Sequence, residues 1–462
     1  MKVDKQDISL AICGHAWHGK STLLGKVVAE SGMATAREID EAKKLAAQGR
    51  DHSLVYAQLV FRSKDVHVEG SEAARGITIL PSIVRFDFPD HRVTVIDTPG
   101  QETYANNRFF GMFQADAAML VVDCDDGLRP ITYQVLRILE GFEIPVHGVA
   151  LTKMDRVQFQ QSAFDARKEE LLRAFDEHGV DASKAVFIPT SAYQPGRDIH
   201  EPGEGISTFK HCTWHKGPSF RDFLSEMSFE RIVDKKLPLR LLIHGSEVYD
   251  NVPGIGRTAT ALVESGVVRP EQTIVFEPLT AEKGHPVTMR VRSVQLTRGH
   301  ISTPGIPLEE GVPRQLLGVA WKTLSEKESL RELFKGRGVI GGTEDAPPRV
   351  ARRALVELTV FDNDTILKPN DEWTIHAHVD RVAAKIDKVL KKRDLAAGPA
   401  GGAWSEATDD MVAPGEWAMC ELSSVTRPFA IEEAKTIPSL SKFVLRKENK
   451  AVAYGRVVEI LE

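Results

Sequence analysis

A glycine-rich loop at residues 14–21, which reads GHAWHGKS, is the part of the sequence best suited to chemistry. It fits the pattern GxxxxGK[ST], and it stands between a short apolar run at residues 8–13 and a stretch, 21–29, that can continue as a helix. In such a loop the backbone N–H groups surround phosphate oxygens, the lysine neutralises the β and γ phosphates, and the hydroxyl binds Mg²⁺. We therefore expect a nucleotide to be bound by Gly14, His15, Trp17, His18, Gly19, Lys20, Ser21 and Thr22.

A second motif, DTPG at residues 97–100, ends the next strong predicted strand. The carboxylate of Asp97 can hold Mg²⁺ through water, and the Gly100 N–H can meet a γ-phosphate. Alone this motif would be a simple turn, but after a phosphate loop it indicates a γ-phosphate sensor. Gln101 follows directly, and a glutamine positions the attacking water in other nucleotide-hydrolysing enzymes.

A third motif, TKMD at residues 152–155, also follows a predicted strand. Asp155 can accept hydrogen bonds from the N1 and N2 groups of guanine, a donor pair that adenine lacks. Ser191 and Ala192, after the last strand, would support the guanine O6 through their backbone N–H groups. The base loop is thus expected to bind guanine through Thr152, Lys153, Asp155, Ser191 and Ala192. Motifs in this order, each at the end of a strand, predict a GTP-binding domain.

The first half of the chain alternates predicted strands and helices. Residues 82–88 and 92–96 read as a β-hairpin, and residues 118–122 and 146–151 are apolar without alternation, as in a parallel sheet covered on both faces. Helical stretches at 131–142 and 164–178 accompany these strands, and 185–188 is one more strand. The pattern predicts an open α/β sheet with helices on both sides.

From about residue 237 the chain changes to short strand-like runs separated by glycine and proline turns, and a second such series begins near residue 350. These two series predict two β-barrels. The expected fold class is therefore an α/β P-loop GTPase domain followed by two β-barrel domains. The expected borders are 1–233 for the GTP-binding domain, 234–345 for the second domain and 346–462 for the third.

Composition excludes several classes of protein. The chain has 462 residues, 42% of them apolar, and a net charge of −6, which is unlike a basic protein that coats nucleic acid. Four cysteines without a CxxC pair exclude a disulfide scaffold, and no apolar run approaches the roughly 18 residues that span a bilayer. The charged N-terminus does not resemble a signal or transit peptide. We therefore expect a soluble cytoplasmic protein.

The motifs resemble those of the translational GTPases, and elongation factor 1-alpha of archaea and eukaryotes more than bacterial elongation factor Tu. The P-loop is similar to that family's GHVDHGKST, and residues 75–79 (RGITI) match its first switch. Residues 238–241, 254–257, 263–270 and 439–455 are similar to its second and third domains, so the resemblance covers nearly the whole chain. It implies that Thr78 binds Mg²⁺ and that Ile77 belongs to an apolar gate near the attacking water.

The sequence departs from the family pattern at several functional positions. The family has Asp where Trp17 stands, His where Gln101 stands and Asn where Thr152 stands. A large ring at position 17 can cover the phosphate site or displace a water molecule, and the Thr152 hydroxyl can replace one bond that ties the base loop to the P-loop. The loop that helps to hold the aminoacyl end of tRNA reads VPRQ here, at residues 312–315, which argues against ordinary aminoacyl-tRNA delivery.

The resemblance implies an elongation-factor-like enzyme that hydrolyses GTP to GDP and phosphate in a ribosome-linked cycle. Its catalytic residues would be Lys20, Ile77 and Gln101, and its Mg²⁺ ligands Ser21, Thr78 and Asp97. The implied partners are the ribosome, tRNA or a tRNA-like protein cargo, and a nucleotide exchange factor, with neither membrane nor DNA.

Three alternatives share this architecture. The first is a carrier GTPase for a release factor or a ribosome-rescue protein, which the changed 312–315 loop favours. The second is the GTPase subunit that regulates ATP sulfurylase, whose P-loop typically has two acidic residues where this chain has Trp17 and His18. The third is a GTP-binding module with little hydrolysis, which Trp17 and Gln101 together suggest.

Two further groups of residues have a functional and a structural interpretation. His211, Cys212 and His215 lack a second pair at zinc-ligand spacing, so a surface loop is preferred over a metal site. His376 and His378 alternate on a predicted strand of the third domain, which in the family contacts tRNA. The basic residues between 385 and 393 could meet phosphates, but a solvated charged face is the preferred interpretation.

Overall fold

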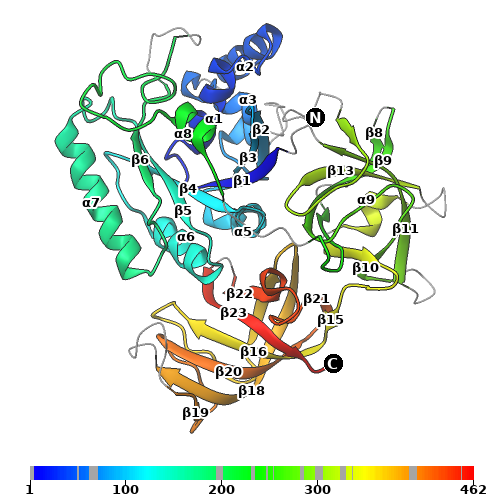
Figure 1. Cartoon of the computed structure of the whole chain (residues 1–462). Coiled ribbons are helices and arrows are strands. Elements are labelled where there is room, and N and C mark those ends of the chain that lie inside the picture. Colours follow the sequence, from blue (N-terminus) through cyan, green and yellow to red (C-terminus); the bar gives the residue numbers. More distant parts are fainter. Residues whose placement is uncertain are drawn as a thin grey trace. The chain divides into compact units, whose positions relative to one another are not determined.

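The computed structural model describes residues 5–48, 51–61, 71–193, 201–229, 235–245, 248–252, 254–280, 286–296, 305–322, 329–335, 337–394, 403–448 and 450–462 (Figure 1). The chain forms two compact units, Met1–Glu230 and Arg231–Glu462. Within the described ranges, no helix is both long and apolar enough to cross a membrane.

The first unit is built on a six-stranded sheet with the order β2-β3-β1-β4-β5-β6. All neighbouring strands are parallel except β2 and β3, which form the predicted hairpin. Every residue of β4 and β5 is buried, because helices cover both faces of the sheet (Figure 1). The strands are β1 Gln6–Cys13, β2 Ser82–Asp87, β3 His91–Asp97, β4 Ala117–Asp123, β5 Val146–Thr152 and β6 Val186–Pro189.

The helices of this unit bury their apolar sides on the sheet. Leu24 of α1 and Phe223 of α8 belong to one core cluster with Leu10 of β1, and α5 lies against β1 and β3. The α-helices are α1 Lys20–Glu30, α2 Ala36–Gln48, α3 Ala57–Val60, α4 Glu72–Arg75, α5 Ala105–Phe113, α6 Pro130–Gly141, α7 Gln161–Glu177 and α8 Phe220–Glu226. Two 3₁₀ turns, η1 His52–Leu54 and η2 Glu102–Tyr104, precede α3 and α5.

The second unit contains two closed six-stranded barrels, as the sequence predicted. The first barrel runs β10-β14-β7-β9-β13-β11 and closes through a β10–β11 pairing. Two short strands extend the ring, β8 by pairing with β9 and β12 by pairing with β11. The elements of this barrel are β7 Arg240–His244, β8 Val248–Val252, β9 Gly256–Ser265, β10 Thr273–Thr280, β11 Pro286–Leu296, β12 Ile306–Leu308, β13 Leu316–Lys322, α9 Leu330–Leu333 and β14 Gly338–Thr343.

The second barrel runs β17-β22-β23-β16-β20-β18 and closes through a β17–β18 pairing. Along β20 buried and part-buried residues alternate, which is the pattern of a strand with one face on a core. Its elements are β15 Val350–Ala351, β16 Arg353–Val360, β17 Glu372–Ala377, β18 Asp380–Asp394, β19 Ser405–Glu406, β20 Glu416–Ser424, β21 Phe429–Ala430, the 3₁₀ turn η5 Pro438–Ser441, β22 Lys442–Lys447 and β23 Lys450–Ile460.

A buried ion pair joins the two barrels within the second unit. Arg240 Nε lies 2.6 Å from Glu432 Oε1, and both side chains are almost fully buried. The same guanidinium donates to the carbonyl oxygen of Ala346 at 2.8 Å, between the barrels in sequence. The predicted border between the first two domains, at 233/234, lies outside the described residues. That border and the one at 345/346 remain predictions.

One expectation about histidines was wrong. His376 lies on β17, but His378 lies after the end of the strand with φ 50°, so the two residues do not alternate along one strand; both side chains are buried. The segment around Cys212 is a loop, as expected, with Thr213 and Lys216 exposed. Cys212 is buried, because the Glu204 carboxylate accepts backbone N–H groups from residues 210–212 and pins the segment down.

Candidate nucleotide-binding site

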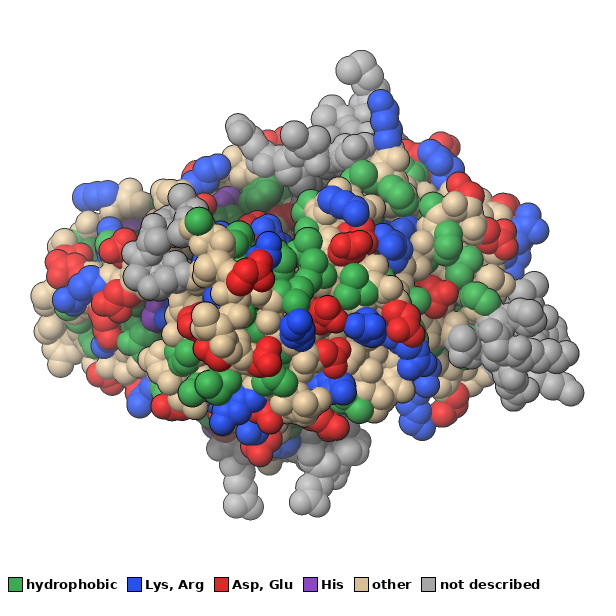
Figure 2. All heavy atoms as spheres, turned by 90° about the horizontal axis from the view of Figure 1, so that it is seen from below, with side chains coloured by type: hydrophobic (Ala, Val, Ile, Leu, Met, Phe, Trp, Pro, Cys, Tyr) green, Lys and Arg blue, Asp and Glu red, His purple; other side chains and the backbone are tan. Residues whose placement is uncertain are grey.

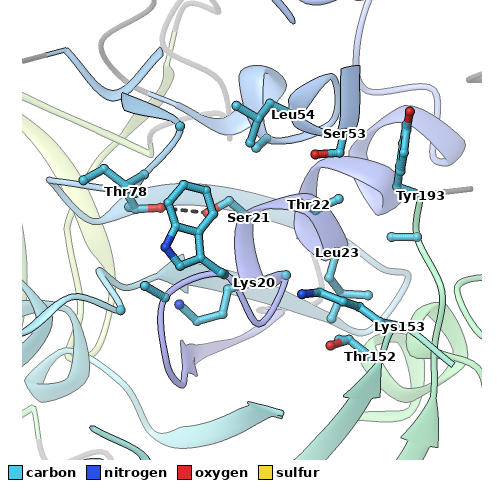
Figure 3. Close-up of a pocket in the computed structure, with 18 of the residues that line it drawn as sticks. Lys20, Ser21, Thr22, Leu23, Ser53, Leu54, Thr78, Thr152, Lys153 and Tyr193 are labelled. Carbon is cyan, nitrogen blue, oxygen red and sulfur yellow. Dashed lines mark hydrogen bonds between the residues drawn. The ribbon is translucent and has the colours of Figure 1, made fainter. Parts of the chain in front are cut away.

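The motifs at the strand ends surround one pocket of about 450 Å³ in the first unit. The pocket lies where β1, β3, β5 and β6 end, which is the edge where ligands bind in open α/β sheets. Figure 3 shows Ser21 and Thr78 toward one end and Lys153 toward the other. The predicted site residues that line it are Trp17, Gly19, Lys20, Ser21, Thr22, Ile77, Thr78, Gly100, Gln101, Thr152, Lys153, Asp155, Ser191 and Ala192.

The loop between β1 and α1 requires glycine at both of its ends. Gly14 has φ 144°, and a Cβ there would lie 2.3 Å from the carbonyl oxygen of Val121. Gly19 has φ 92° and is the N-cap of α1. The first turn of α1, with the positive end of its dipole, therefore begins at the pocket and favours an anion there.

Lys20 places a cation at this anion site. Its side chain is buried, and burial lowers the pKa of its ammonium group to about 8. Its Nζ donates to the carbonyl oxygen of His15 at 2.9 Å. A Cβ on Gly100 would lie 2.4 Å from the same Nζ and from the backbone nitrogen of Ala16, so glycine lets the DTPG turn approach the P-loop. A bound anion would stabilise the charged lysine, which burial alone disfavours.

Three oxygen-bearing side chains meet at the start of α1. Ser21 Oγ donates to Asp97 Oδ2 at 2.6 Å and lies 2.7 Å from Thr78 Oγ1, which donates to the same carboxylate oxygen at 3.2 Å (Figure 3 draws the Ser21–Thr78 bond). The other oxygen, Asp97 Oδ1, is buried and has no hydrogen-bond partner among the described residues. Burial raises the pKa of this carboxyl group to about 6. Two hydroxyls and a carboxylate with an unsatisfied oxygen form a hard ligand set that fits Mg²⁺.

The opposite end of the pocket carries the TKMD motif. Ser191 Oγ donates to Asp155 Oδ1 at 2.5 Å, which fixes the carboxylate. Lys153 has φ 56°, and its Nζ lies 2.8 Å from Asp123 Oδ2 at the end of β4. Thr152 Oγ1 donates to the carbonyl oxygen of His18 at 2.6 Å, so this hydroxyl does tie the base loop to the P-loop. The arrangement presents a fixed carboxylate to a planar ligand that carries paired donors.

Four of the predicted site residues do not line the pocket: Gly14, His15, His18 and Asp97. The rings of His15 and His18 lie 5.0 Å apart, and His18 is 1% exposed with Nε2 at 3.2 Å from Asp126 Oδ2. The side chains of these two residues therefore support the loop, whose backbone faces the pocket.

Acid should destabilise the first unit through His18. Because burial lowers the pKa of this imidazole from 6.5 to about 4, the unfolded chain binds more protons than the folded chain between these pH values. The contribution of neutral His18 to the free energy of unfolding is fully present above pH 6.5. It is lost as the pH falls toward 4, by about 1–3 kcal/mol. Urea unfolding at about pH 7 and pH 4.5 should show a smaller loss for His18→Gln than for the native chain. The exposed-site control His52→Gln should behave as native, and an equal loss in His18→Gln would contradict this assignment.

The residues expected near the attacked phosphate also reach the pocket. Ile77 is buried beside Thr78, and Gln101 precedes η2 with its backbone carbonyl accepting from Arg108 Nη1 at 3.4 Å. Trp17 has φ 66° and is 56% exposed while it lines the pocket. A ring that is this exposed is not packed into the core, so it lies at the opening of the phosphate end.

Sequence reasoning missed one whole wall of the pocket. This wall is formed by η1, α3, the residue after α3 and the chain after β6, which contribute Ser53, Leu54, Ala57, Phe61 and Tyr193. They belong to no nucleotide-binding motif. The one available signal was the position of Tyr193, directly after the predicted Ser191 and Ala192.

A P-loop before α1, a buried carboxylate at the end of β3 and a TKMD motif after β5 define the first unit as a P-loop GTPase domain. Residues 5–215 match the family described as "Elongation factor Tu GTP binding domain", and residues 353–458 match "GTP-eEF1A C-terminal domain-like". The chain belongs to the translational GTPases of the elongation factor 1-alpha and elongation factor Tu type, and it is a GTPase that binds guanine nucleotide.

Curated relatives extend this similarity over the full length. The chain is 29% identical to elongation factor 1-alpha of Archaeoglobus fulgidus over 100% of this chain and 99% of that protein. It is 28% identical to the elongation factor 1-alpha of Natronomonas pharaonis over 100% of both chains.

Solved structures share the fold at lower identity. The Ski7 GTPase-like domain of S. cerevisiae bound to GTP superposes with a TM-score of 0.74 at 16% identity, over 98% of this chain and 97% of that one. Translation elongation factor SelB from Methanococcus maripaludis with the GTP analogue GppNHp gives a TM-score of 0.65 at 16% identity, over 99% of this chain and 80% of that one.

Proposed function

We propose that this chain is a translation-linked GTPase that binds GTP with Mg²⁺ in the pocket of its first unit and hydrolyses it in a ribosome-linked cycle. The observation that carries the proposal is the distribution of polar groups along one pocket. A Ser21–Thr78–Asp97 cluster lies at one end, and the Asp155–Ser191 pair lies at the other. This is the separation of functions that a nucleoside triphosphate requires.

The phosphates are proposed to lie between the P-loop and Gly100. Lys20 supplies positive charge to the β and γ phosphates, Thr22 and the backbone from Gly14 to Gly19 donate to their oxygens, and the start of α1 adds its dipole. Because Lys20 is buried, its charge acts on the phosphates with little screening by water.

The metal ligands are proposed to be Ser21 and Thr78, with Asp97 holding the ion directly or through water. Bound Mg²⁺ would neutralise phosphate charge. Thr78 belongs to the switch sequence RGITI, so its hydroxyl links that switch to the ligand set. Asp97 Oδ1, which is buried and finds no hydrogen-bond partner in the described part of the chain, would be satisfied by this cation.

The base is proposed to be guanine. Asp155 accepts from N1 and N2, and the backbone of Ser191 and Ala192 faces O6. Ser191 holds the carboxylate, and Thr152 fixes the loop to the P-loop through the carbonyl of His18.

Hydrolysis is proposed to depend on Gln101, which would position the attacking water, with Ile77 in the apolar gate. Intrinsic hydrolysis should be slow and stimulated by ribosomes, because Gln101 must be held against the water, and its side chain is only partly buried where it lines the pocket.

Single-turnover hydrolysis with and without ribosomes tests this assignment. Gln101→Ala should remove the stimulation, by about 100-fold or more if this side chain positions the water, whereas Gln161→Ala on the exposed surface of α7 should not. If Gln101→Ala changes nothing while Trp17→Asp raises the rate, the chain is instead a GTP-binding module whose hydrolysis is suppressed.

The cargo is proposed to be aminoacyl-tRNA or a related, tRNA-like protein, and one observation favours a protein. In the 312–315 loop, Arg314 forms an ion pair with Glu264 and has φ 69°, and its N–H donates to the carbonyl of Val263 at 2.6 Å. Arg314 is therefore engaged by its own domain, in the loop that in the family helps to hold the aminoacyl end of tRNA.

The candidate cargoes can be distinguished by a pull-down from native lysate with a GTP analogue bound, which would enrich aminoacyl-tRNA, a release-factor-like protein or a sulfurylase. The cycle would also require a nucleotide exchange factor.

The basic stretch of β18 gives little support to a phosphate-binding surface. Lys392 lies 2.8 Å from Asp409 Oδ1, and Arg393 lies 2.9 Å from Glu357 Oε1. Figure 2 likewise shows acidic and basic side chains interspersed over the face in view. Contacts with tRNA in this unit are therefore proposed from the family resemblance and not from a positively charged patch.

A further inference from the structure

The pocket wall formed by residues 51–61 packs closely against α1, although it belongs to the insertion between α1 and the switch. A Cβ on Gly25 of α1 would lie 1.9 Å from the carbonyl oxygen of Tyr56, so the two segments pack backbone to backbone. Lys26 Nζ donates to the Tyr56 hydroxyl at 3.0 Å, and Ala57 and Phe61 are buried. The wall is thus fixed to the helix that follows the P-loop, and its groups are positioned before a ligand binds.

Ser53 presents a hydroxyl from this wall into the pocket. Its N–H and Oγ both donate to Asp51 Oδ1, at 2.9 and 2.5 Å. A serine oxygen whose proton is engaged in this way keeps its lone pairs for accepting another hydrogen bond. Ser53 is therefore an oriented acceptor.

The position of Ser53 along the pocket corresponds to the sugar of a nucleotide. Figure 3 shows it above Thr22, on the side toward Tyr193, and all three residues line the same pocket. Thr22 belongs to the phosphate loop, and Tyr193 follows the residues proposed to bind the base. The ribose joins base and α-phosphate, so it must lie between these two groups. Its hydroxyls are donors that match the acceptor on Ser53.

The adjacent Leu54 connects this wall to the switch. A Cβ on Gly76 would lie 2.7 Å from Leu54 Cδ1, and Gly76 has φ 62° and directly precedes Ile77 and Thr78. A contact at the ribose would therefore be made by a segment that already packs against the switch backbone.

We propose that Ser53 accepts a hydrogen bond from a ribose hydroxyl of the bound guanine nucleotide, and that the η1–α3 segment is the ribose-recognising wall of the site. This inference rests on the proposed nucleotide site and adds a specificity determinant that none of the nucleotide-binding motifs supplies. The native chain should accordingly distinguish ribonucleotides from deoxyribonucleotides.

The test is calorimetric titration of the full chain with GDP, 2′-deoxy-GDP and 3′-deoxy-GDP. The native chain should bind GDP about 3- to 10-fold more tightly than at least one deoxy analogue, which is the range expected for one neutral hydrogen bond. Ser53→Ala should abolish this preference by weakening GDP while leaving the deoxy analogue unchanged, and Ser53→Thr, which keeps the hydroxyl, should retain it.

The matched control is Ser183→Ala. Ser183 makes the same contacts to an aspartate two residues earlier, with N–H and Oγ donating to Asp181 Oδ1 at 3.1 and 2.7 Å, but it is exposed and does not line the pocket. The Ser183→Ala variant should bind GDP and both deoxy analogues as tightly as the native chain does. The proposal is overturned if the native chain does not distinguish the sugars, or if Ser53→Ala weakens all three ligands equally. A native chain that binds none of the three would instead refute the nucleotide site itself.

Discussion

Replacing Lys20 by alanine should weaken the binding of GTP and GDP by roughly 100- to 1,000-fold. The side chain is buried at the start of α1, and a triphosphate in this pocket would lose its buried neutralising cation. Removing one partner of a buried charge pair costs about 2–5 kcal/mol, and the lowered pKa of Lys20 already shows that this cation is desolvated before the anion arrives. The measurement is the Kd of a fluorescent guanine nucleotide by equilibrium titration.

The control for this prediction is Lys184→Ala, the same change at an exposed position of the same unit. It should leave the Kd within about twofold, because a screened surface charge contributes little. If the two variants bind equally well, the phosphates do not lie at the P-loop lysine.

Asp155→Asn should exchange guanine for xanthine specificity. The native carboxylate can accept from both N1 and N2 of guanine, and each hydrogen bond to a charged group contributes about 1.5–3 kcal/mol. Losing that acceptor pair should weaken GTP by roughly 100-fold or more, whereas the new amide can donate to the C2 oxygen of xanthine. Ser191 favours a clean exchange, because its hydroxyl holds the side-chain oxygen at position 155 in one orientation.

The comparison is a competition of GTP and XTP against a fluorescent nucleotide for the native chain, Asp155→Asn and Asp165→Asn. Asp165 is exposed on α7 and provides the same charge change away from the pocket. Loss of GTP binding without any gain for XTP would mean that position 155 supports the loop but does not contact the base.

Sequence alone predicted the residues whose role depends on local backbone chemistry. Gly19, Lys20 and Ser21 stand at a strand–loop–helix junction, where the pattern itself fixes the geometry, and the structure places all three in the pocket. The same holds for Asp155, three residues after the end of β5. Because parallel strands bring their carboxyl ends to one edge of the sheet, motifs that are distant in the chain come together there.

The wall of residues 51–61 could not be predicted, because it is positioned by tertiary packing. Its place depends on the close approach of Tyr56 to Gly25, two positions that carry no pattern in the sequence. Helices α5 and α8 were missed for a related reason. They have 9 and 7 residues, against 17 in α7, so their apolar pattern repeats over too few turns to identify a helix.

The error for His378 has a similar physical origin. Alternation predicts a common face for His376 and His378 only if the strand continues through both residues. The chain instead turns after Ala377, with His378 at φ 50°. For Cys212, the burial comes from Glu204, whose carboxylate gathers backbone donors from a segment that reads as an ordinary loop.

The central claim, that the pocket selects a guanine nucleotide, is tested most directly by calorimetric titration of the native chain with GTP and with ATP in the presence of Mg²⁺. The fixed Asp155 carboxylate matches the N1 and N2 donors of guanine and finds no such pair on adenine. We expect ATP to bind at least about 100-fold more weakly than GTP, from the two hydrogen bonds it cannot make. Equal affinity for the two nucleotides would contradict the assignment of Asp155 and the account of the site built on it.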